Sequence, residues 1–433
     1  MKSSLRLVLL LLVLLVQLGL GQLTRTHGLA TSKSGFAAAV TYGTAGDQAV
    51  SVAIADVNRD GKPDLVVSNF CGTVNNAKDN NCGSGGIGLL LGNGNGTFQP
   101  ASDILSDGYL ADSVAVADLN GDGNPDIVVA NFYSCLTCGT GSIGVFFGKG
   151  DGTFEPEVLY SSGGAAAYSV VIADVNGDRK PDLVVSNAGI LGVLLNNGDG
   201  TFQPAMTYDS GGDGAYAVTV ADVNGDGISD ILVANGCASP CVGGIGSVGV
   251  LFGNGNGTFQ APVTYASNGQ NSYSIAVADL NGDGNPDIIL ANWCSAESCS
   301  YGSVSVLLNN GDGTFQTATT FTSGGYRAVS VTVADVNGDG KPDLLVANLC
   351  ANMNCSPLGG VVGVLLGNGD GTFQPPAIYE SGGTGAWSVA LADVNGDGKP
   401  DISVANNQTP GSVGVLINTS PTAMTFRPSF FVK

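Results

Sequence analysis

Seven acidic loops of nine residues carry the clearest chemistry in this chain. They begin at Asp56, Asp118, Asp174, Asp222, Asp279, Asp335 and Asp393, and six of them read D-x-N-x-D-G-x-x-D. Oxygen-bearing side chains therefore recur at loop positions 1, 3, 5 and 9, and a glycine at position 6 permits a sharp turn. Calcium takes roughly six to eight oxygen ligands from carboxylates, amides and backbone carbonyls. This spacing indicates one calcium site in each loop.

In each loop we expect the side chains at positions 1, 3, 5 and 9 and the backbone carbonyl at position 7 to bind the ion. The predicted calcium ligands, in loop order, are Asp56, Asn58, Asp60, Lys62, Asp64; Asp118, Asn120, Asp122, Asn124, Asp126; Asp174, Asn176, Asp178, Lys180, Asp182; Asp222, Asn224, Asp226, Ile228, Asp230; Asp279, Asn281, Asp283, Asn285, Asp287; Asp335, Asn337, Asp339, Lys341, Asp343; Asp393, Asn395, Asp397, Lys399 and Asp401.

Two other interpretations of the loops are weaker. An EF-hand needs a glutamate at position 12, where this chain has an apolar residue such as Val346. Solvated Asx turns give no reason for aspartates at positions 1, 5 and 9, and three carboxylates within about 4–5 Å repel by several kcal/mol. The third loop has Arg179 at position 6. Because a non-glycine residue in a left-handed turn costs about 1–2 kcal/mol, we expect this site to be the weakest.

The acidity of the chain belongs to these loops. The net charge is −21, from 36 acidic and 15 basic residues, and the loops hold 21 of the acidic ones. Nucleic acids and anionic membranes need a basic face, so neither is an expected partner.

The ten cysteines form five local pairs, each placed after the strand that follows an acidic loop. We predict disulfides Cys71–Cys82, Cys135–Cys138, Cys237–Cys241, Cys294–Cys299 and Cys350–Cys355. Each repeat has either both cysteines of a pair or neither, which indicates disulfides formed in an oxidising compartment. A redox role for Cys135-x-x-Cys138 and a zinc site are weaker interpretations, since the first has four equivalents and no histidine accompanies any pair.

The amino terminus has the pattern of a secretory leader. A basic start and an apolar run from Leu7 to Val16 predict a signal peptide at residues 1–21 and a flexible segment at residues 22–34. A membrane anchor is the alternative, but the run is short for a bilayer, and no later segment is long and apolar enough to span. We expect a secreted, extracellular protein.

The loops recur every 48 to 62 residues, a period typical of propellers or solenoids. Each repeat has four short apolar runs separated by glycine-rich turns, as in Val329–Val333, Asp343–Asn348, Val361–Leu366 and Thr372–Tyr379. We therefore predict an all-β fold over residues 35–433, a seven-bladed β-propeller with four antiparallel strands per blade. Either terminus, near Phe36 or near Phe426, is expected to complete the last blade.

The chain resembles FG-GAP/VCBS repeat proteins, whose repeats form the seven-bladed propeller of integrin α subunits. Phe147-Gly148 and Phe252-Gly253 match the Phe-Gly of the family name, and the acidic loops are the most specific match. The Gly-Ala-Pro part is poorly kept, with Gln260-Ala261-Pro262 nearest to it. The resemblance implies that ligands bind on the face away from the calcium loops.

Strand alternation supports the same choice of face. The acidic loop and the Asn-Gly turn follow odd strands, so both lie on one face, and the cysteine loops lie on the other. The cysteine face also carries aromatic residues, of which Tyr133, Trp293, Tyr301 and Trp387 are the predicted ligand-face residues. We expect Tyr133 and Trp293 to be exposed. For four aromatics that recur at one repeat position, packing between blades and ligand binding are equal alternatives: Tyr168, Tyr216, Tyr273 and Trp387.

We therefore predict a secreted, calcium-binding β-propeller that acts as a binding or adhesion module for an extracellular protein or glycan, through the face opposite the calcium loops. A self-assembling structural protein, formed through an unpaired terminal strand, is the alternative. An enzyme, such as a lyase or hydrolase, is disfavoured. The single histidine, His27, lies beside the leader and not in the propeller. The four glutamates, Glu155, Glu157, Glu297 and Glu380, lie in different repeats, except that Glu155 and Glu157 share one strand, so no facing acid/base pair is evident.

Overall fold

The computed structural model describes residues 35–72, 84–135, 139–238, 241, 244–296, 299–355 and 359–420. The predicted leader at 1–21, the segment at 22–34 and Phe426 lie outside these residues. Contacts group the chain into Met1–Lys33 and Ser34–Lys433, and the description below concerns the second unit. Within the described residues the regular elements are all strands. No helix that is long and apolar enough to cross a membrane occurs among these residues.

Five sheets have four strands each, all paired in the antiparallel sense. Their hydrogen-bonded orders are β2-β3-β4-β5, β6-β7-β8-β9, β10-β11-β12-β13, β21-β22-β23-β24 and β25-β26-β27-β1. The strands are β1 (Val40–Gly43), β2 (Gly46–Ala55), β3 (Asp64–Gly72), β4 (Gly86–Leu90), β5 (Ser102–Leu105), β6 (Tyr109–Ala117), β7 (Asp126–Tyr133), β8 (Ser142–Phe146), β9 (Val158–Ser161), β10 (Ala167–Ala173), β11 (Asp182–Asn187), β12 (Ile190–Leu194), β13 (Met206–Asp209), β21 (Tyr326–Ala334), β22 (Asp343–Cys350), β23 (Val361–Leu365), β24 (Ala377–Glu380), β25 (Ala386–Ala392), β26 (Asp401–Asn406) and β27 (Ser412–Leu416).

A sixth sheet has seven strands in sequence order. They are β14 (Gly212–Ala221), β15 (Asp230–Ala238), β16 (Ile245–Leu251), β17 (Val263–Ala278), β18 (Asp287–Ser295), β19 (Ser303–Leu307) and β20 (Thr319–Thr322). The long strand β17 pairs with β16 near its beginning, as in Val263↔Val250, and with β18 towards its end, as in Ala278↔Asp287. It therefore links two groups of strands that each repeat the pattern of the four-stranded sheets.

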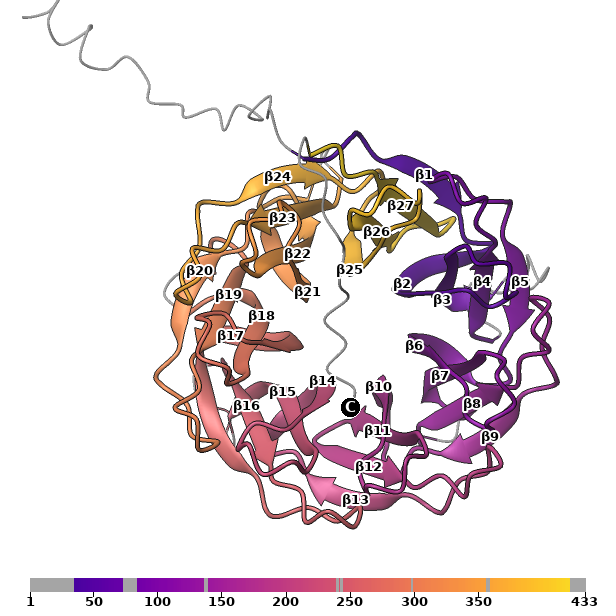
Figure 1. The fold of residues 1–433 in the computed structure, drawn as a ribbon, viewed down its shortest axis with the longest axis horizontal. Helices are drawn as coiled ribbons and strands as arrows, with labels where there is room; N and C mark the ends of the chain where they lie inside the picture. Colours follow the sequence, from indigo (N-terminus) through magenta and orange to yellow (C-terminus); the bar gives the residue numbers. More distant parts are fainter. Residues whose placement is uncertain are drawn as a thin grey trace, which may run out of the picture. The chain divides into compact units, whose positions relative to one another are not determined.

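The sheets follow one another around a ring in a propeller-like arrangement (Figure 1). Strand β1 closes this ring, because it pairs with β27 in the register Val40↔Val415. Phe36 forms a bridge with Asn418, the place that Phe98 and its equivalents occupy elsewhere. Of the two termini considered from the sequence, the N-terminal strand thus completes the last sheet. It is not left unpaired for donation to a neighbour.

The core lies between neighbouring sheets. The second and third strands of most sheets are buried along most of their length, as in β7 and β8, because another sheet covers each face. One cluster joins Val66 and Ile87 of one sheet to Ile127 and Val129 of the next. Another joins Leu65 to Val413 and so packs the first sheet against the last. The apolar runs in the sequence are therefore continuous rather than alternating.

A buried polar pair recurs beside the core. Ser162 donates to the Asn187 side-chain oxygen at 2.6 Å, and the Asn187 amide donates back to the Ser162 carbonyl at 3.1 Å. Both hydrogen bonds recur in Thr44–Asn69, Ser323–Asn348 and Ser381–Asn406. Ser106–Asn131 has only the hydroxyl bond, and Ser210–Asn235 has only the amide bond. Each pair ties the segment before the first strand of a sheet to the end of its second strand.

We expect Gly414→Ala to destabilise the ring. A Cβ at Gly414 in β27 would overlap the backbone carbonyl of Ser381, whereas a Cβ at Gly43 in the neighbouring strand β1 meets nothing within 4 Å. Such overpacking costs about 1–3 kcal/mol. Urea unfolding should show a lower midpoint for Gly414→Ala and little change for the control Gly43→Ala. Equal midpoints for the two variants would contradict the closely packed third strand.

Candidate functional site

Each acidic loop connects the first and second strands of a four-stranded pattern. The position-9 aspartate is in every case the first residue of the second strand, as Asp64 is in β3 and Asp401 is in β26. The loop is therefore held between two hydrogen-bonded strand ends, which fixes where its side chains point.

The side chains at positions 1, 3 and 5 turn inward onto the backbone of their own loop. In the seventh loop, Asp393 accepts hydrogen bonds from the N–H groups of Gly396 at 2.7 Å, Asp397 at 3.0 Å and Gly398 at 2.7 Å. Asn395 accepts from the same Asp397 N–H at 2.8 Å, and Asp397 accepts from Lys399 N–H at 3.0 Å. Oxygens of positions 1 and 3 thus lie against one nitrogen.

This arrangement fits a calcium ion by its donor chemistry. Each side-chain oxygen uses one lone pair on a backbone N–H, and a carboxylate or amide oxygen has a second lone pair for a cation. The same pattern of backbone donors holds in the second, third, fourth and fifth loops, where the position-5 N–H meets the oxygens of positions 1 and 3. These hydrogen bonds fix the conformation of the loops, and calcium binding by the groups at all five positions stays a prediction.

The position-9 aspartate has a different setting from the other loop carboxylates. It is fully buried in each loop. In the seventh loop one Asp401 oxygen accepts from Val394 N–H at 3.0 Å and the other from Asn418 N–H at 2.7 Å. It therefore joins the loop to the turn after the third strand, and its role includes holding the sheet together.

The electrostatics of position 9 reflect this burial. Burial raises the pKa of Asp343 to about 7 and the pKa values of Asp182, Asp230, Asp287 and Asp401 to about 6. The two backbone donors oppose this shift, and the carboxylates at positions 5 and 1 of the same loop add to it. Three carboxylates thus lie close enough to repel one another.

Two arginines occupy left-handed backbone positions in these loops. Arg179 at position 6 of the third loop has φ 67°, and its glycine equivalents also have positive φ, so the expected strain is present. Arg59 at position 4 of the first loop has φ 59°, where the other loops have glycine. The sequence contained this second departure, because position 4 is glycine in the other six loops, but we had not singled it out. Arg59 donates to Asn124 of the second loop at 3.1 Å.

The loops of neighbouring sheets form a continuous belt on one face. The turn after the third strand of one sheet contacts the acidic loop of the sheet before it in the ring. Gly96 N–H donates to Val394 O at 3.0 Å, and the Asn196 amide donates to Leu119 O at 2.8 Å. The predicted sharing of one face by the acidic loops and the Asn-Gly turns agrees with these contacts.

The cysteine loops contain three disulfides among the described residues. Cys237–Cys241, Cys294–Cys299 and Cys350–Cys355 have Cα separations of 5.3, 4.7 and 4.9 Å, and these predicted pairs are confirmed. Cys82 and Cys138, the predicted partners of Cys71 and Cys135, lie outside the described residues. Asp213 lies near Cys237 and Cys241, but sulfurs joined in a disulfide offer no thiolate to a metal.

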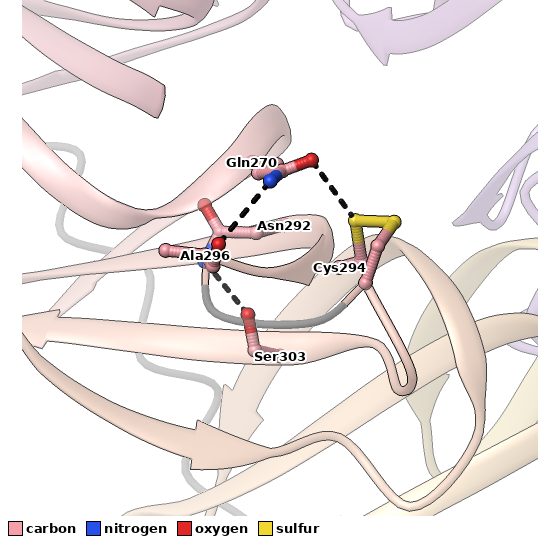
Figure 2. The surroundings of a disulfide bond; sticks show 6 residues. Gln270, Asn292, Cys294, Ala296 and Ser303 are labelled. Carbon is pink, nitrogen blue, oxygen red and sulfur yellow. Dashed lines mark hydrogen bonds between the residues drawn. A yellow bond between two sulfur atoms is a disulfide. The ribbon is translucent and has the colours of Figure 1, made fainter. Parts of the chain in front are cut away.

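One of these loops is attached to the strand beside it. Gln270 of β17 donates to Ala296 O at 3.3 Å, and its side-chain oxygen lies 3.5 Å from the sulfur of Cys294 (Figure 2). Asn292 donates to the Ser303 hydroxyl at 3.5 Å across the neck of the same loop. The disulfide and these polar contacts hold the start of the loop against the sheet.

The predicted ligand-face aromatics fall in three places. Tyr301 is 46% exposed and lies 5.1 Å from the ring of Tyr326. Tyr133 and Trp293 are half-buried, so their expected exposure was wrong: Tyr133 packs on Phe132 at 4.5 Å, and Trp293 lies under the Arg327 guanidinium at 5.2 Å. Trp387 faces the centre of the ring and lines a cavity there.

Comparison with known proteins gives a family match along most of the chain. A family profile described as an FG-GAP-like repeat matches residues 78–129, 133–185, 174–233, 241–290, 293–346 and 351–404. Phosphatidylinositol-glycan-specific phospholipase D of Bos taurus is 31% identical over 151 residues, and that of Homo sapiens is 29% identical over 160 residues. Each alignment covers 31% of this chain and 18% of the relative, so the match spans under a fifth of those relatives' length.

Two solved structures resemble this chain at low sequence identity. A chain in the crystal structure of BBS1N in complex with ARL6DN, soaked with lead, has a TM-score of 0.57 and 11% identity, covering 91% of this chain and 100% of that one. An Agrocybe aegerita lectin that recognises non-reducing terminal N-acetylglucosamine has a TM-score of 0.49 and 20% identity, covering 90% and 96%. The first likeness supports a propeller-like all-β fold.

Substitutions at positions 1 and 9 of one loop should separate ion binding from structure. In the wild-type protein both Asp401 oxygens accept a backbone N–H. Asp401→Asn replaces one of these oxygens with an amide NH2, so one buried N–H loses its acceptor, at a cost of about 1–3 kcal/mol. We expect it to lower the melting temperature in both calcium and EDTA. Asp393→Asn also replaces one acceptor oxygen, but the N–H groups of that exposed loop can bind water instead, so its larger effect on the melting temperature should be in calcium. Calorimetry of both variants in both buffers tests this, and the reverse pattern would contradict the assignment.

Proposed function

This chain belongs to the FG-GAP repeat family, and from that premise we propose that it is a seven-bladed, calcium-stabilised β-propeller that acts as an extracellular binding module. The count of seven blades follows when the seven-stranded sheet is divided at β17, whose two ends pair with different neighbours. The seven acidic loops then fall one to a blade.

Calcium is proposed as the resident ion of the acidic loops. The ligands in each loop are the oxygens of positions 1, 3, 5 and 9 and the carbonyl of position 7, and the ion supplies positive charge among three carboxylates. The inward-turned side chains of Asp393, Asn395 and Asp397 support this proposal. We expect the third loop to bind calcium most weakly because of Arg179. Arg59, which also has positive φ, should weaken calcium binding by the first loop in a similar way.

The binding surface is proposed to be the face that carries the cysteine loops. The single observation that carries this proposal is the concentration there of disulfide-closed loops of different length together with aromatic side chains. Variable loops on a rigid scaffold are where recognition usually lies. The partner class is an extracellular protein or a glycan, and secretion is proposed from the disulfides and the amino-terminal pattern.

An enzymatic role is not part of this proposal. The phospholipase relatives match over 18% of their length, so their activity is not transferred to this chain. Glu157, one of the few glutamates, is committed to structure, since it accepts hydrogen bonds from Ser106 and from the backbone N–H of Asp107. Self-assembly through a free terminal strand is also less favoured, because β1 is paired within the chain.

Removal of calcium should lower thermal stability. A ligand that binds only the folded state at 100 times its Kd adds about 2.7 kcal/mol per site, so excess EDTA should lower the melting temperature by many degrees. Added calcium should restore it, and magnesium at the same concentration should restore it less, since magnesium demands near-octahedral geometry. Superimposable melting curves with and without EDTA would refute the calcium proposal.

The binding face can be tested on an array of glycans and extracellular proteins in millimolar calcium. A ligand found there should lose affinity with Tyr301→Ser, which alters an exposed aromatic of the cysteine face. The matched control Val158→Ser alters a residue of similar exposure, 40% against 46%, near the acidic-loop end of β9. Loss of affinity with Val158→Ser alone would place the binding surface on the opposite face.

A further inference from the structure

Seven strands that face the centre of the ring carry the same irregularity. The pairing register shifts by one residue in β2, β6, β10, β14, β17, β21 and β25, for example between Ala111 and Ser113. The residues left without a partner are Val50, Asp112, Tyr168, Tyr216, Tyr273, Val329 and Trp387. A bulge of this kind redirects a side chain, and bulges are common beside functional sites.

These redirected side chains line one cavity of about 380 Å³. The residues after them, mostly serines, and two phenylalanines, Phe70 and Phe132, complete its wall. The lining strands are those nearest the centre of the ring (Figure 1). Because Phe70 and Phe132 lie at the ends of second strands, the cavity is at the cysteine-loop side. Its volume is within the roughly 300–1,000 Å³ usual for small-molecule sites.

Aromatic rings form an arc along the cavity. Phe132 lies 5.1 Å from Tyr168, Tyr168 lies 5.3 Å from Tyr216, and Tyr216 stacks on Tyr273 at 4.5 Å. Trp387 also lines the cavity, and it stacks on no other ring among the described residues. The side chain is partly exposed, so part of it can meet a ligand in the cavity.

Asp112 is the one charged side chain that lines this cavity. No described residue hydrogen-bonds or ion-pairs with its carboxylate, and the residue keeps some exposed surface. Burial within the ring raises the pKa of Asp112 to about 8. Burial, together with Tyr216 and Asp112 as neighbours, raises the pKa values of Tyr168 and Tyr273 to about 12, so both stay neutral. At neutral pH this carboxyl group of Asp112 is therefore largely protonated, and a bound cation would favour its ionised form.

The chemistry of the wall selects among ligand classes. A calcium ion needs roughly six to eight oxygens, and the wall offers one carboxylate. A cation would give the ionised carboxylate the counter-charge that no described residue supplies, whereas a neutral ligand would not. Four of the serine hydroxyl oxygens already accept a backbone N–H from the corresponding strand of the next blade at 3.2–3.4 Å, so part of the hydrogen-bonding capacity of the wall is used within the protein, whereas the aromatic ring faces need no hydrogen bond from a ligand.

We propose that the cavity binds a quaternary ammonium group, with Asp112 as counter-charge and the aromatic faces of Tyr168 and Trp387 around the cation. A quaternary ammonium donates no hydrogen bonds and is attracted to aromatic faces by cation–π interaction. This site does not depend on whether the cysteine face binds a protein or a glycan.

Isothermal titration of the full chain in calcium, with choline as the probe, tests the proposal. We expect saturable binding of choline, with weaker binding of ethanolamine and of 3,3-dimethyl-1-butanol, the neutral analogue of the same shape. Equal affinity for the neutral analogue, tighter binding of ethanolamine, displacement of choline by millimolar calcium, or no saturable binding of choline would each overturn the proposal.

Matched variants assign the binding to the cavity. Asp112→Asn should weaken choline binding about tenfold or more, because it removes the counter-charge. Asp107→Asn makes the same charge change at an exposed residue outside the wall and should leave affinity unchanged. Trp387→Leu should weaken binding about 5- to 30-fold, and Trp387→Phe should largely retain it. Choline affinity unaffected by Asp112→Asn, in a variant with wild-type melting temperature, would exclude the site.

Discussion

The buried aspartate at position 9 of each acidic loop is the interaction on which the architecture depends. One carboxylate accepts from the loop that follows the first strand and from the turn that follows the third, so it fixes three strands of a sheet at one end. This geometry also brings the same carboxylate close to the acidic side chains of positions 1 and 5. If the loops bind calcium as proposed, the need for a cation follows from the way the sheet is fastened, and stability and ion binding would share one residue.

Much of the architecture could be predicted from the sequence because it repeats. The spacing of Asp335, Asn337, Asp339 and Asp343 is visible without a structure, and strand alternation correctly separates the acidic loops from the cysteine loops. The pairs Cys237–Cys241, Cys294–Cys299 and Cys350–Cys355 were predictable because they occupy equivalent places. Which terminus completes the last sheet was not predictable, since Phe36 and Phe426 both resemble the required strand and only the pairing of β1 with β27 decides.

The surroundings of single side chains were harder to predict. Tyr133 and Trp293 follow buried strands and precede loops, a position that gives no indication of the rings and the guanidinium that cover them. Tyr168, Tyr216, Tyr273 and Trp387 were recognised as equivalent, yet an apolar pattern does not reveal a register shift, and the shift is what turns them to the centre of the ring. The role of Asp112 follows from that same shift.

The pairing of β1 with β27 also governs the order in which the molecule can be assembled. Strand β1 is synthesised long before its partner β27, because Val40 pairs with Val415. The intervening sheets can form as their four strands are synthesised, but the circular arrangement exists only after β27 is released. Until then, the sheet edge that β1 will cover stays open, and such edges promote association between chains. Completion of the ring is therefore a late step that a cell must protect.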